Sequence, residues 1–597
     1  MKIKAATMDG TTEKIKAAYV LDGISSSPGI AISKVFLLQG ESVKIDPSTM
    51  THSDAKAEVE KFKNAIQEAK NELKTLQRRV AQRIGRESAK IFDVHQLLLE
   101  DSLIIEDTIS GIEKENKNAE HAFYDTMQKY QNTLDESAVE YFQSRISDLK
   151  DVKRRVIRHI QGTRTNYLNK LEGTAVIVAR DLTPSDTVML DKRKVLGFAT
   201  DLGGKFSHVS IMARSMEVPA VVGLRRLSSL VTEGDRIIVD GNEGRVLIQP
   251  DEKTLKHYRQ LQAKYYEVEQ RLSEIRDLPC ITMDGKEIEL SANLEFLDEA
   301  QSVLSHGAKG IGLYRTEFLY LAKNELPTEE EQFQEYSKIV KKFAPEPVII
   351  RTMDLGGDKH PQSILIPPEE NPFLGWRAIR ISLERQDIFK VQLRAILRAG
   401  AEGNVKILFP MISGFDELQE CKHVLEQTKA ELLKQKIPFN PEIEIGVMIE
   451  IPSAAILADK LAQEVNFLSI GTNDLVQYLL AVDRGNERIA YLYKHLHPAV
   501  LRMIKHIIMA GHQQGVWVGM CGEMASDPLA TVILLGLDLD EFSVSPLFVP
   551  EIKKIIRSID HREAVRIANK VLEFEKASEV ERFMIKVMRK KFKDLIF

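Results

Sequence analysis

Residues 203–214 read Gly-Gly-Lys-Phe-Ser-His-Val-Ser-Ile-Met-Ala-Arg, and the rest of the chain is organised around this stretch. Its two glycines follow an apolar run at 195–199, and a helical pattern opens at Ser207. A glycine turn before a helix start gathers unpaired backbone N–H groups, to which the helix dipole adds partial positive charge. Such a place suits phosphate. His208 could carry a phosphoryl group there, with Arg214 as a fixed cation. This stretch alone indicates equally well that His208 only caps the helix.

The composition indicates an ordinary protein of several domains. A length of 597 residues suggests three or four domains. A net charge of -5 with 28% charged residues favours neither nucleic acid nor a membrane surface as partner. The cysteines Cys280, Cys421 and Cys521 are far apart without metal-ligand spacing, which is typical of a reducing compartment. No apolar run is long enough to span a bilayer and no secretory signal is present, so we expect a cytoplasmic protein without membrane insertion.

The first part of the chain is predicted to hold a helical bundle. Residues 1–22 read as a polar leader with little commitment to structure, and a strand-like run follows at 31–38. Apolar residues then recur at helical spacing over 59–80, 91–105, 123–134 and 149–160. Four helices with short connections predict a small bundle. A bundle between β-segments more often presents a docking face than serves as a spacer.

From Thr174 onward, the sequence pattern is that of an α/β domain. Short apolar strands are predicted at 175–178, 195–199 and 220–223, with a hairpin over 237–248. His208 therefore belongs to a compact α/β domain that the bundle interrupts. One amphipathic helix over 251–276, ended by Pro279, is predicted to join this domain to the next.

From Cys280 onward, strand-like and helical patterns alternate. The strand-like runs cover 289–294, 310–314, 347–350, 405–409, 445–449, 467–470, 516–520 and 541–544. Eight strands with intervening helices over roughly 300 residues match a TIM-type (β/α)₈ barrel, in which the active site lies where strands end.

The predicted strand ends carry a distinctive set of side chains. These are Arg315, Arg351, Glu450, Asn473, Asp474 and Cys521, with Arg484 shortly after Asp474. A single arginine after a strand is usually a rim salt bridge, but three arginines, two carboxylates and a thiol in corresponding places are not explained in that way. Arginines bind phosphate and carboxylate, and two carboxylates suit Mg²⁺. A lone thiol is a candidate proton donor or acceptor, whereas Cys280 and Cys421 are expected to be small buried residues.

Five motifs make the chain recognisable. They are Gly-Leu-Tyr-Arg-Thr-Glu-Phe (312–318), Arg-Thr-Met-Asp-Leu-Gly-Gly-Asp-Lys (351–359), Asn-Pro-Phe-Leu-Gly-Trp-Arg (371–377), Ser-Ile-Gly-Thr-Asn-Asp-Leu (469–475) and Gly-Met-Cys-Gly-Glu (519–523). With the stretch around His208, they resemble enzyme I of the bacterial phosphoenolpyruvate:sugar phosphotransferase system over nearly the whole length from about Ser26.

The resemblance implies a role for each of these residues. His208 accepts the phosphoryl group of phosphoenolpyruvate through Nε2. Arg315, Arg351 and Arg484 hold the phosphate and carboxylate of that substrate, assisted by Asn473 and Arg377. Glu450 and Asp474 hold Mg²⁺. Cys521 protonates the enolate carbon to give pyruvate.

The resemblance also implies partners and a division into domains. The bundle docks a small histidine phosphocarrier protein (HPr), to which His208 passes its phosphate, and the barrel forms a homodimer. The expected parts are a leader (1–22), a swivelling α/β phosphohistidine domain (23–50 and 165–250), the inserted four-helix bundle (51–164), a linker helix (251–279) and the phosphoenolpyruvate-binding barrel (280–597).

Two departures from the family concern the phosphohistidine and the docking face. Phe206 stands where the family usually has threonine, and Arg86 and Ser102 stand where it often has charged or acidic residues. We expect the docking patch to be apolar, with Ile91, Leu97, Leu98 and Leu103 around His95. Such a patch predicts a carrier with a less basic, more apolar face than the usual HPr.

Two alternatives remain at this point. A phosphoenolpyruvate synthase or pyruvate phosphate dikinase shares the histidine and barrel motifs but places a large ATP-binding module first. Only about 200 residues precede His208, without a glycine-rich nucleotide loop, which disfavours these enzymes. A non-catalytic regulatory homologue has Phe206 as its only support, and the retained barrel residues oppose it.

Overall fold

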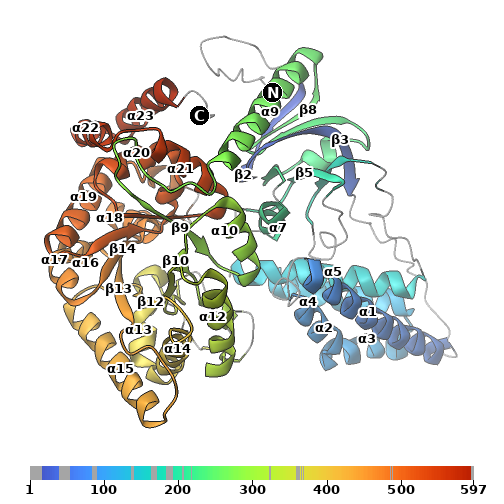
Figure 1. Cartoon of the computed structure of the whole chain (residues 1–597). Helices are drawn as coiled ribbons and strands as arrows, with labels where there is room; N and C mark the ends of the chain where they lie inside the picture. Colours follow the sequence, from blue (N-terminus) through green and yellow to red (C-terminus); the bar gives the residue numbers. More distant parts are fainter. Residues whose placement is uncertain are drawn as a thin grey trace. The chain divides into compact units, whose positions relative to one another are not determined.

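The computed structural model divides the chain into two compact units, Met1–Glu267 and Val268–Phe597, which are described separately. The residues that the structure describes are 17–38, 54–83, 91–135, 140–162, 171, 173–182, 193–204, 208–216, 218–321, 325–357, 363–364, 366–367, 369–484, 486 and 488–592. Figure 1 labels their helices and strands.

The α/β part of the first unit is an eight-stranded sheet with the order β1-β8-β7-β3-β4-β5-β6-β2. Its strands are β1 (Ala17–Asp22), β2 (Ile24–Ser27), β3 (Ile30–Leu38), β4 (Ala175–Ala179), β5 (Val195–Thr200), β6 (Ala220–Val222), β7 (Arg236–Asp240) and β8 (Arg245–Pro250). The predicted strands are confirmed. The prediction of an uncommitted leader is wrong for residues 17–22, because β1 pairs antiparallel with β8 and buries Leu21 in the core.

The helical part of the first unit lies between β3 and β4 in the chain. It consists of α1 (Ala55–Arg83), α2 (Ile91–Glu100), α3 (Ser102–Glu115), α4 (Ala119–Asp135) and α5 (Glu140–Ile160). The helical run predicted over 91–105 is therefore two helices. Asp101 separates them, since its carboxylate accepts hydrogen bonds from the backbone N–H groups of Leu103 and Ile104 and caps α3.

Three further helices lie in the described residues of this part of the chain. They are α7 (His208–Met216), α8 (Leu227–Leu230) and α9 (Glu252–Glu274). The helix predicted over 251–276 is confirmed as α9. It ends shortly before Pro279, as proline cannot continue a helix.

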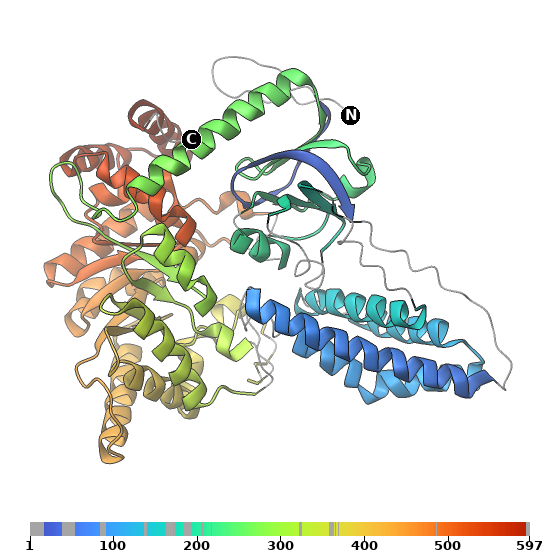
Figure 2. The ribbon, with the colours of Figure 1, turned by 45° about the vertical axis from the view of Figure 1, so that its right-hand side comes forward.

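The second unit is a closed barrel of parallel strands in the order β10-β11-β12-β13-β14-β15-β16-β9. The strands are β9 (Glu289–Leu294), β10 (Ile311–Tyr314), β11 (Val348–Arg351), β12 (Val405–Phe409), β13 (Glu444–Ile449), β14 (Phe467–Ile470), β15 (Trp517–Met520) and β16 (Glu541–Val544). Each lies within one residue of its prediction, so the (β/α)₈ fold is confirmed. Helices surround the strands in both views of this unit (Figures 1 and 2).

The helices of the barrel unit surround the strands. They are α10 (Ala300–His306), α11 (Glu317–Leu321), α12 (Glu329–Phe343), α13 (Ile379–Glu384), α14 (Gln386–Ala399), α15 (Phe415–Lys434), α16 (Pro452–Ile456), α17 (Ala458–Leu461), α18 (Thr472–Leu480), α19 (Pro498–Gln513), α20 (Pro528–Gly536), α21 (Val549–Arg557), α22 (His561–Val571) and α23 (Ala577–Lys591). Of these helices, α22 and α23 pack against α20. Cys280 and Cys421 belong to the core of this unit as buried free thiols, as predicted.

Candidate active site

The fold brings the predicted strand-end residues to one edge of the barrel. Arg351 is the last residue of β11, while Arg315, Glu450 and Cys521 directly follow β10, β13 and β15. Asn473 and Asp474 lie in the first turn of α18, which follows β14. Since all strands of the barrel are parallel, their carboxyl ends meet at the same edge, where barrel enzymes build their active sites.

Arg351 and Arg377 are linked through one carboxylate, that of Asp354. Arg351 Nη1 lies 3.1 Å from Asp354 Oδ2, and Arg377 Nη2 lies 3.0 Å from Asp354 Oδ1. Arg351 also donates through Nη2 to Glu317 Oε1 at 2.9 Å. All four side chains are buried. Asp354 therefore fixes both guanidinium groups at once.

Arg377 also contacts one of the two predicted metal ligands, and the backbone holds the other. Arg377 Nη1 lies 3.3 Å from Asp474 Oδ1 and also donates to the hydroxyl of Tyr478 at 3.1 Å. Glu450 Oε1 accepts a hydrogen bond from the N–H of Met411 at 2.7 Å. We call Glu317, Arg351, Asp354, Arg377, Glu450 and Asp474 the barrel network.

The barrel network has a surplus of negative charge around Glu450. Burial raises the pKa of the Glu450 carboxyl, the negative charges of Asp474 and Asp354 raise it further, and Arg351 and Arg377 only partly oppose them. The turn that carries Asp474 approaches Glu450 closely, because a Cβ on Gly471 would lie 2.7 Å from Glu450 Oε2. A hard divalent cation would relieve this repulsion, so the two carboxylates fit the predicted metal.

Two carboxylates alone do not complete a metal shell. Within the described ranges, no group of three or more His, Cys, Asp or Glu side chains gathers in a way that could hold a metal ion. A cation held by Glu450 and Asp474 would keep positions for water and a substrate oxygen, as Mg²⁺ does in phosphoryl-transfer sites.

The arginines also keep donors available for a ligand. The Nε–H groups of Arg351 and Arg377 are buried, and neither has a hydrogen-bond partner among the residues that the structure describes. A buried donor without a partner costs free energy. An anionic ligand in the barrel mouth would supply the missing acceptors.

The other predicted substrate residues lie at the same edge but outside the network. Arg315 and Arg484 are half-buried, and in the described part of the chain neither guanidinium forms a hydrogen bond or ion pair with the network. Asn473 Oδ1 accepts from the N–H of Glu523 at 2.8 Å, which ties the loop after β14 to the loop after β15.

Cys521 lies inside the barrel against an apolar cluster. The thiol is buried and packs with Leu313, Ile349, Leu408, Met448 and Phe467. Burial raises the pKa of Cys521 to about 11, although a hydrogen bond from Ser469 and the charge of Arg351 lower it. The residue is therefore a protonated thiol at neutral pH, which suits a proton donor.

The backbone around His208 matches the predicted turn. His208 is the first residue of α7. Gly203 has a φ of 110°, which favours glycine, and the hydroxyl of Ser210 donates to the carbonyl of Gly204 at 2.6 Å. The side chains of His208 and Arg214 lie outside what the structure describes.

The prediction that His95 sits in an exposed docking patch is wrong. His95 is fully buried, and its Nδ1 lies 3.3 Å from Asp151 Oδ2. Leu97 and Leu103 are exposed to 57% and 61%, as expected of a patch, whereas Leu98 packs against the bundle core. The side chain of Ile91 lies outside the described residues.

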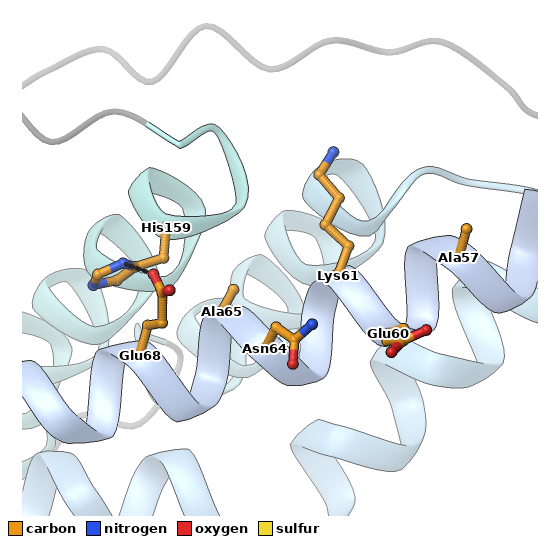
Figure 3. A pocket seen from close by; sticks show the side chains of 7 residues that line it. All are labelled: Ala57, Glu60, Lys61, Asn64, Ala65, Glu68 and His159. Carbon is orange, nitrogen blue, oxygen red and sulfur yellow. Dashed lines mark hydrogen bonds and ion pairs between the residues drawn. The ribbon is translucent and has the colours of Figure 1, made fainter.

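A hollow of about 380 Å³ lies on the bundle. Figure 3 shows its lining by Ala57, Glu60, Lys61, Asn64, Ala65, Glu68 and His159, with His159 turned toward Glu68. His159 Nδ1 lies 3.1 Å from Glu68 Oε2, so its imidazole serves an ion pair within the bundle.

Sequence reasoning missed the carboxylates that orient the arginines. Glu317 and Asp354 stand inside two of the quoted motifs, at 312–318 and 351–359. Their signal was their place close behind a strand-end arginine, but their role depends on contacts with Arg351 and Arg377 that only the folded barrel forms.

Comparisons with known proteins identify three domains in this chain. Family models match residues 22–145 as the N-terminal domain of a PEP-utilising enzyme, 171–244 as its mobile domain and 269–561 as its PEP-binding domain. Within the described residues, no helix is long and apolar enough to cross a membrane.

Relatives cover nearly the whole chain. A phosphoenolpyruvate-protein phosphotransferase of Bacillus sp. (strain S) is 44% identical over 564 residues, which are 94% of this chain and 97% of its own. That of Haemophilus influenzae is 43% identical over 565 residues, covering 95% and 98%. A solution structure of an Enzyme I protein covers 41% of this chain and 99% of its own at 40% identity, with a TM-score of 0.36. The chain belongs to the phosphoenolpyruvate-protein phosphotransferase family of PEP-utilising enzymes.

Proposed function

We propose that this enzyme transfers the phosphoryl group of phosphoenolpyruvate to its own His208 and then to the phosphocarrier HPr, with release of pyruvate. This is the first step of the sugar phosphotransferase system. The observation that carries the proposal is the barrel network, in which buried arginines and carboxylates face one strand edge beside the thiol of Cys521. Phosphoryl transfer needs mainly positioning and charge neutralisation, and these groups provide both.

The substrate is proposed to bind through charge. Arg351 and Arg377 would offer their buried Nε–H groups to its phosphate or carboxylate oxygens. Arg315, Asn473 and Arg484 would hold the remaining oxygens from neighbouring loops of the same edge. Bidentate arginine contacts fix the orientation of both anionic groups, which holds phosphorus in one place for attack.

A metal ion is part of the proposal. Glu450 and Asp474 would hold Mg²⁺, which when bound neutralises charge on the phosphate oxygens. Their burial and mutual repulsion support this assignment, because both make the pair costly without a cation. Asp354 and Glu317 keep the arginines beside the carboxylates without engaging the metal pair directly.

Cys521 is proposed to give its proton to C3 of the enolate of pyruvate. Among the site residues it is the group that is both protonated at neutral pH and free to release a proton, since the arginines stay charged and Glu450 and Asp474 are assigned to the metal. The α/β domain, which contains strands β1 to β8, would carry phosphorylated His208 to HPr on the bundle (51–164).

A homodimer through the barrel (280–597) is also proposed. Ile456 and Leu457, in and after α16, are exposed to 61% and 39%, and Met509 of α19 is exposed to 49%. The two helices are adjacent, since His506 Nε2 lies 3.4 Å from the carbonyl of Ile456. Exposed apolar side chains gathered on neighbouring helices are typical of subunit contacts. The buried free cysteines favour a cytoplasmic location.

The proposal is tested by incubating the full chain with phosphoenolpyruvate and Mg²⁺ and analysing it by mass spectrometry without acid. We expect one phosphoryl group on His208 for each pyruvate formed, and neither product with His208→Gln. Asp474→Asn should lose phosphorylation by phosphoenolpyruvate yet accept phosphate from phosphorylated HPr. Labelling of His208→Gln at another residue would contradict the assignment of the phosphohistidine.

A further inference from the structure

Proton transfer from a buried thiol leaves a charge that the protein has to accommodate. Cys521 is 3% exposed and packs against apolar side chains. A thiolate in such surroundings is costly unless a hydrogen-bond donor or a positive charge faces the sulfur. The surroundings of Cys521 therefore decide how readily it can act as an acid.

The main chain of Cys521 is held from both sides. Its N–H donates to the carbonyl of Ile470 on β14 at 3.2 Å. Its carbonyl accepts from Asn293 Nδ2 on β9 at 3.0 Å, and Asn293 Oδ1 accepts in turn from the hydroxyl of Ser543 on β16 at 2.7 Å. These bonds fix the Cα–Cβ bond of Cys521 relative to the barrel.

The sulfur itself faces one hydroxyl. Ser469 is 1% exposed and lies on β14, where it pairs in register with Gly519 of β15. Its Oγ donates to Cys521 Sγ at 3.3 Å, and the thiol in turn points to the carbonyl of Ile470 at 3.9 Å. A hydroxyl that donates to sulfur stabilises the thiolate more than the thiol.

We propose that Ser469 is a positioning residue for the protonation step, and that its hydroxyl holds the Cys521 sulfur and stabilises the thiolate that the step leaves. The inference rests on the proposed role of Cys521. In the step, the S–H bond of Cys521 breaks and its proton forms the new C–H bond at C3 of the enolate. The enolate becomes the ketone of pyruvate, and the negative charge moves from its oxygen to sulfur. Water returns a proton to the thiolate after the product leaves.

The charges around the sulfur support this role. Arg351 on β11 lowers the pKa of the Cys521 thiol, while Glu450 after β13 and Glu541 on β16 raise it. Because the two carboxylates oppose thiolate formation, the hydroxyl of Ser469 assists Arg351 in making the proton available.

The test compares Ser469→Ala with Ser469→Thr and with the control Ser337→Ala. Ser337 is also a buried barrel-unit serine, but its hydroxyl bonds to Glu402 on the outer side of the barrel. The probe is phosphoenolpyruvate with stereospecific deuterium at C3, turned over once in tritiated water. Phosphorylation of His208, pyruvate formation, its solvent isotope effect and the chirality of the pyruvate methyl group are measured.

We expect Ser469→Ala to phosphorylate His208 within a few-fold of the wild-type rate. Protonation should slow by about 10- to 100-fold, the effect of losing a hydrogen bond to a charged group. Its solvent isotope effect should rise, and its pyruvate should lose chirality because the enolate escapes before it is protonated. Ser469→Thr should restore both rate and chirality, and Ser337→Ala should behave as wild type.

Chiral pyruvate formed at the wild-type rate by Ser469→Ala would overturn the inference. If Ser469→Ala does not fold, Ser469→Thr is compared with Ser469→Val, because the two side chains share a shape and only threonine carries the hydroxyl. Equal rates and equal chirality in these two variants would also overturn the inference. Cys521→Ala separates the role of the thiol from the role of Ser469. Chiral pyruvate from Cys521→Ala would refute the role of the thiol, whereas achiral pyruvate from Cys521→Ala with normal Ser469 variants would refute only the role of Ser469.

Discussion

The bundle and the barrel each hold a network of ionisable side chains, and the two networks balance their charges in opposite ways. In the bundle, basic side chains surround each carboxylate: Glu72 contacts Arg155, Arg158 and His159 at 2.5, 2.6 and 2.7 Å. Asp151 likewise lies 3.3 Å from His95 and 3.5 Å from Arg155. We call these six residues the bundle network.

The barrel network has the opposite balance, with four carboxylates to two arginines. The consequence appears in the pKa values. Burial alone would raise the pKa of Glu72, but the hydrogen bond to His159 and the charges of Arg155 and Arg158 hold it at about 2. Burial and neighbouring carboxylates instead raise the pKa of Glu450. A network whose charges balance serves stability. A network with a surplus of one charge is suited to a ligand that neutralises this surplus.

The largest expected effect comes from removing one arginine from each network. Arg351→Met removes a buried cation that contacts both Glu317 and Asp354, so phosphorylation of His208 by phosphoenolpyruvate should fall by about 10²- to 10³-fold. Arg155→Met should instead lower the free energy of unfolding of the bundle by about 3 to 5 kcal/mol and leave the affinity for phosphoenolpyruvate unchanged. Rapid-quench kinetics and denaturant unfolding measure the two effects. A loss of substrate affinity in Arg155→Met would break the comparison.

Opposite pH dependence of the two regions is the next expectation. Glu72, with a pKa lowered to about 2 from 4.5, stabilises the bundle above pH 4.5, and this contribution is lost as the pH falls toward 2. Inside the barrel, burial raises the pKa of Glu541 from 4.5 to about 7, so its contribution of roughly 3 kcal/mol is present below pH 4.5 and lost as the pH rises through 7.

Hydrogen exchange of each region across this pH range measures the difference. Glu72→Gln should reduce the loss of stability at acidic pH in the bundle alone. Glu541→Gln should reduce part of the loss of barrel stability as the pH rises. The remaining loss should persist because burial also raises the pKa of Glu551 to about 7. Equal pH dependence in the two regions would show that their charges are balanced alike.

A smaller effect is expected from the bridging carboxylate of the barrel network. Asp354→Asn removes the charge that orients Arg351 and Arg377, so kcat should fall by about 10-fold. KM should change less, because the arginines gain net positive charge toward an anionic substrate as they lose orientation. Asp387→Asn, which alters the exposed pair with Arg385, is the matched control and should behave as wild type. An unchanged kcat in Asp354→Asn would remove Asp354 from the site.

The smallest effect concerns the exposed face of the bundle. Leu103→Ser should slow phosphoryl transfer to HPr by only a few-fold, because a single exposed leucine contributes about 1 kcal/mol when a partner covers it. The rate should depend weakly on ionic strength. Leu433→Ser, on the barrel and 71% exposed, serves as the control. Steep salt dependence would indicate that acidic residues of the bundle guide the carrier instead.

The fold was predictable where a local pattern determines it. The barrel strands follow from apolar runs that recur between helical segments, and each lies within one residue of its prediction. Local patterns were insufficient where a distant partner decides the outcome. Residues 17–22 become a strand only because β8 offers an edge, more than 220 residues later in the chain. His95 is buried, and its Nδ1 lies 3.3 Å from a carboxylate on another helix, that of Asp151.

In the site, too, local patterns predict some residues, whereas others depend on distant partners. Strand-end positions marked Arg351, Glu450 and Cys521, since parallel strands of a barrel converge at one edge. The functions inferred for Asp354 and Ser469 depend on which side chain faces which across strands. Ser469 stands in a quoted motif, yet only the register of β14 with β15 reveals that its hydroxyl meets the thiol of Cys521.

The central claim is that a ligand completes the barrel network, whereas the charges of the bundle network balance without one. Hydrogen exchange of His208→Ala, which should bind phosphoenolpyruvate without turnover, tests it most directly when measured with and without phosphoenolpyruvate and Mg²⁺. We predict slower exchange in the segments 351–357, 471–484 and 520–524 of the barrel and unchanged exchange in 64–76 and 149–160 of the bundle. Unchanged exchange in the barrel segments at saturating ligand, or protection confined to the bundle, would contradict the account.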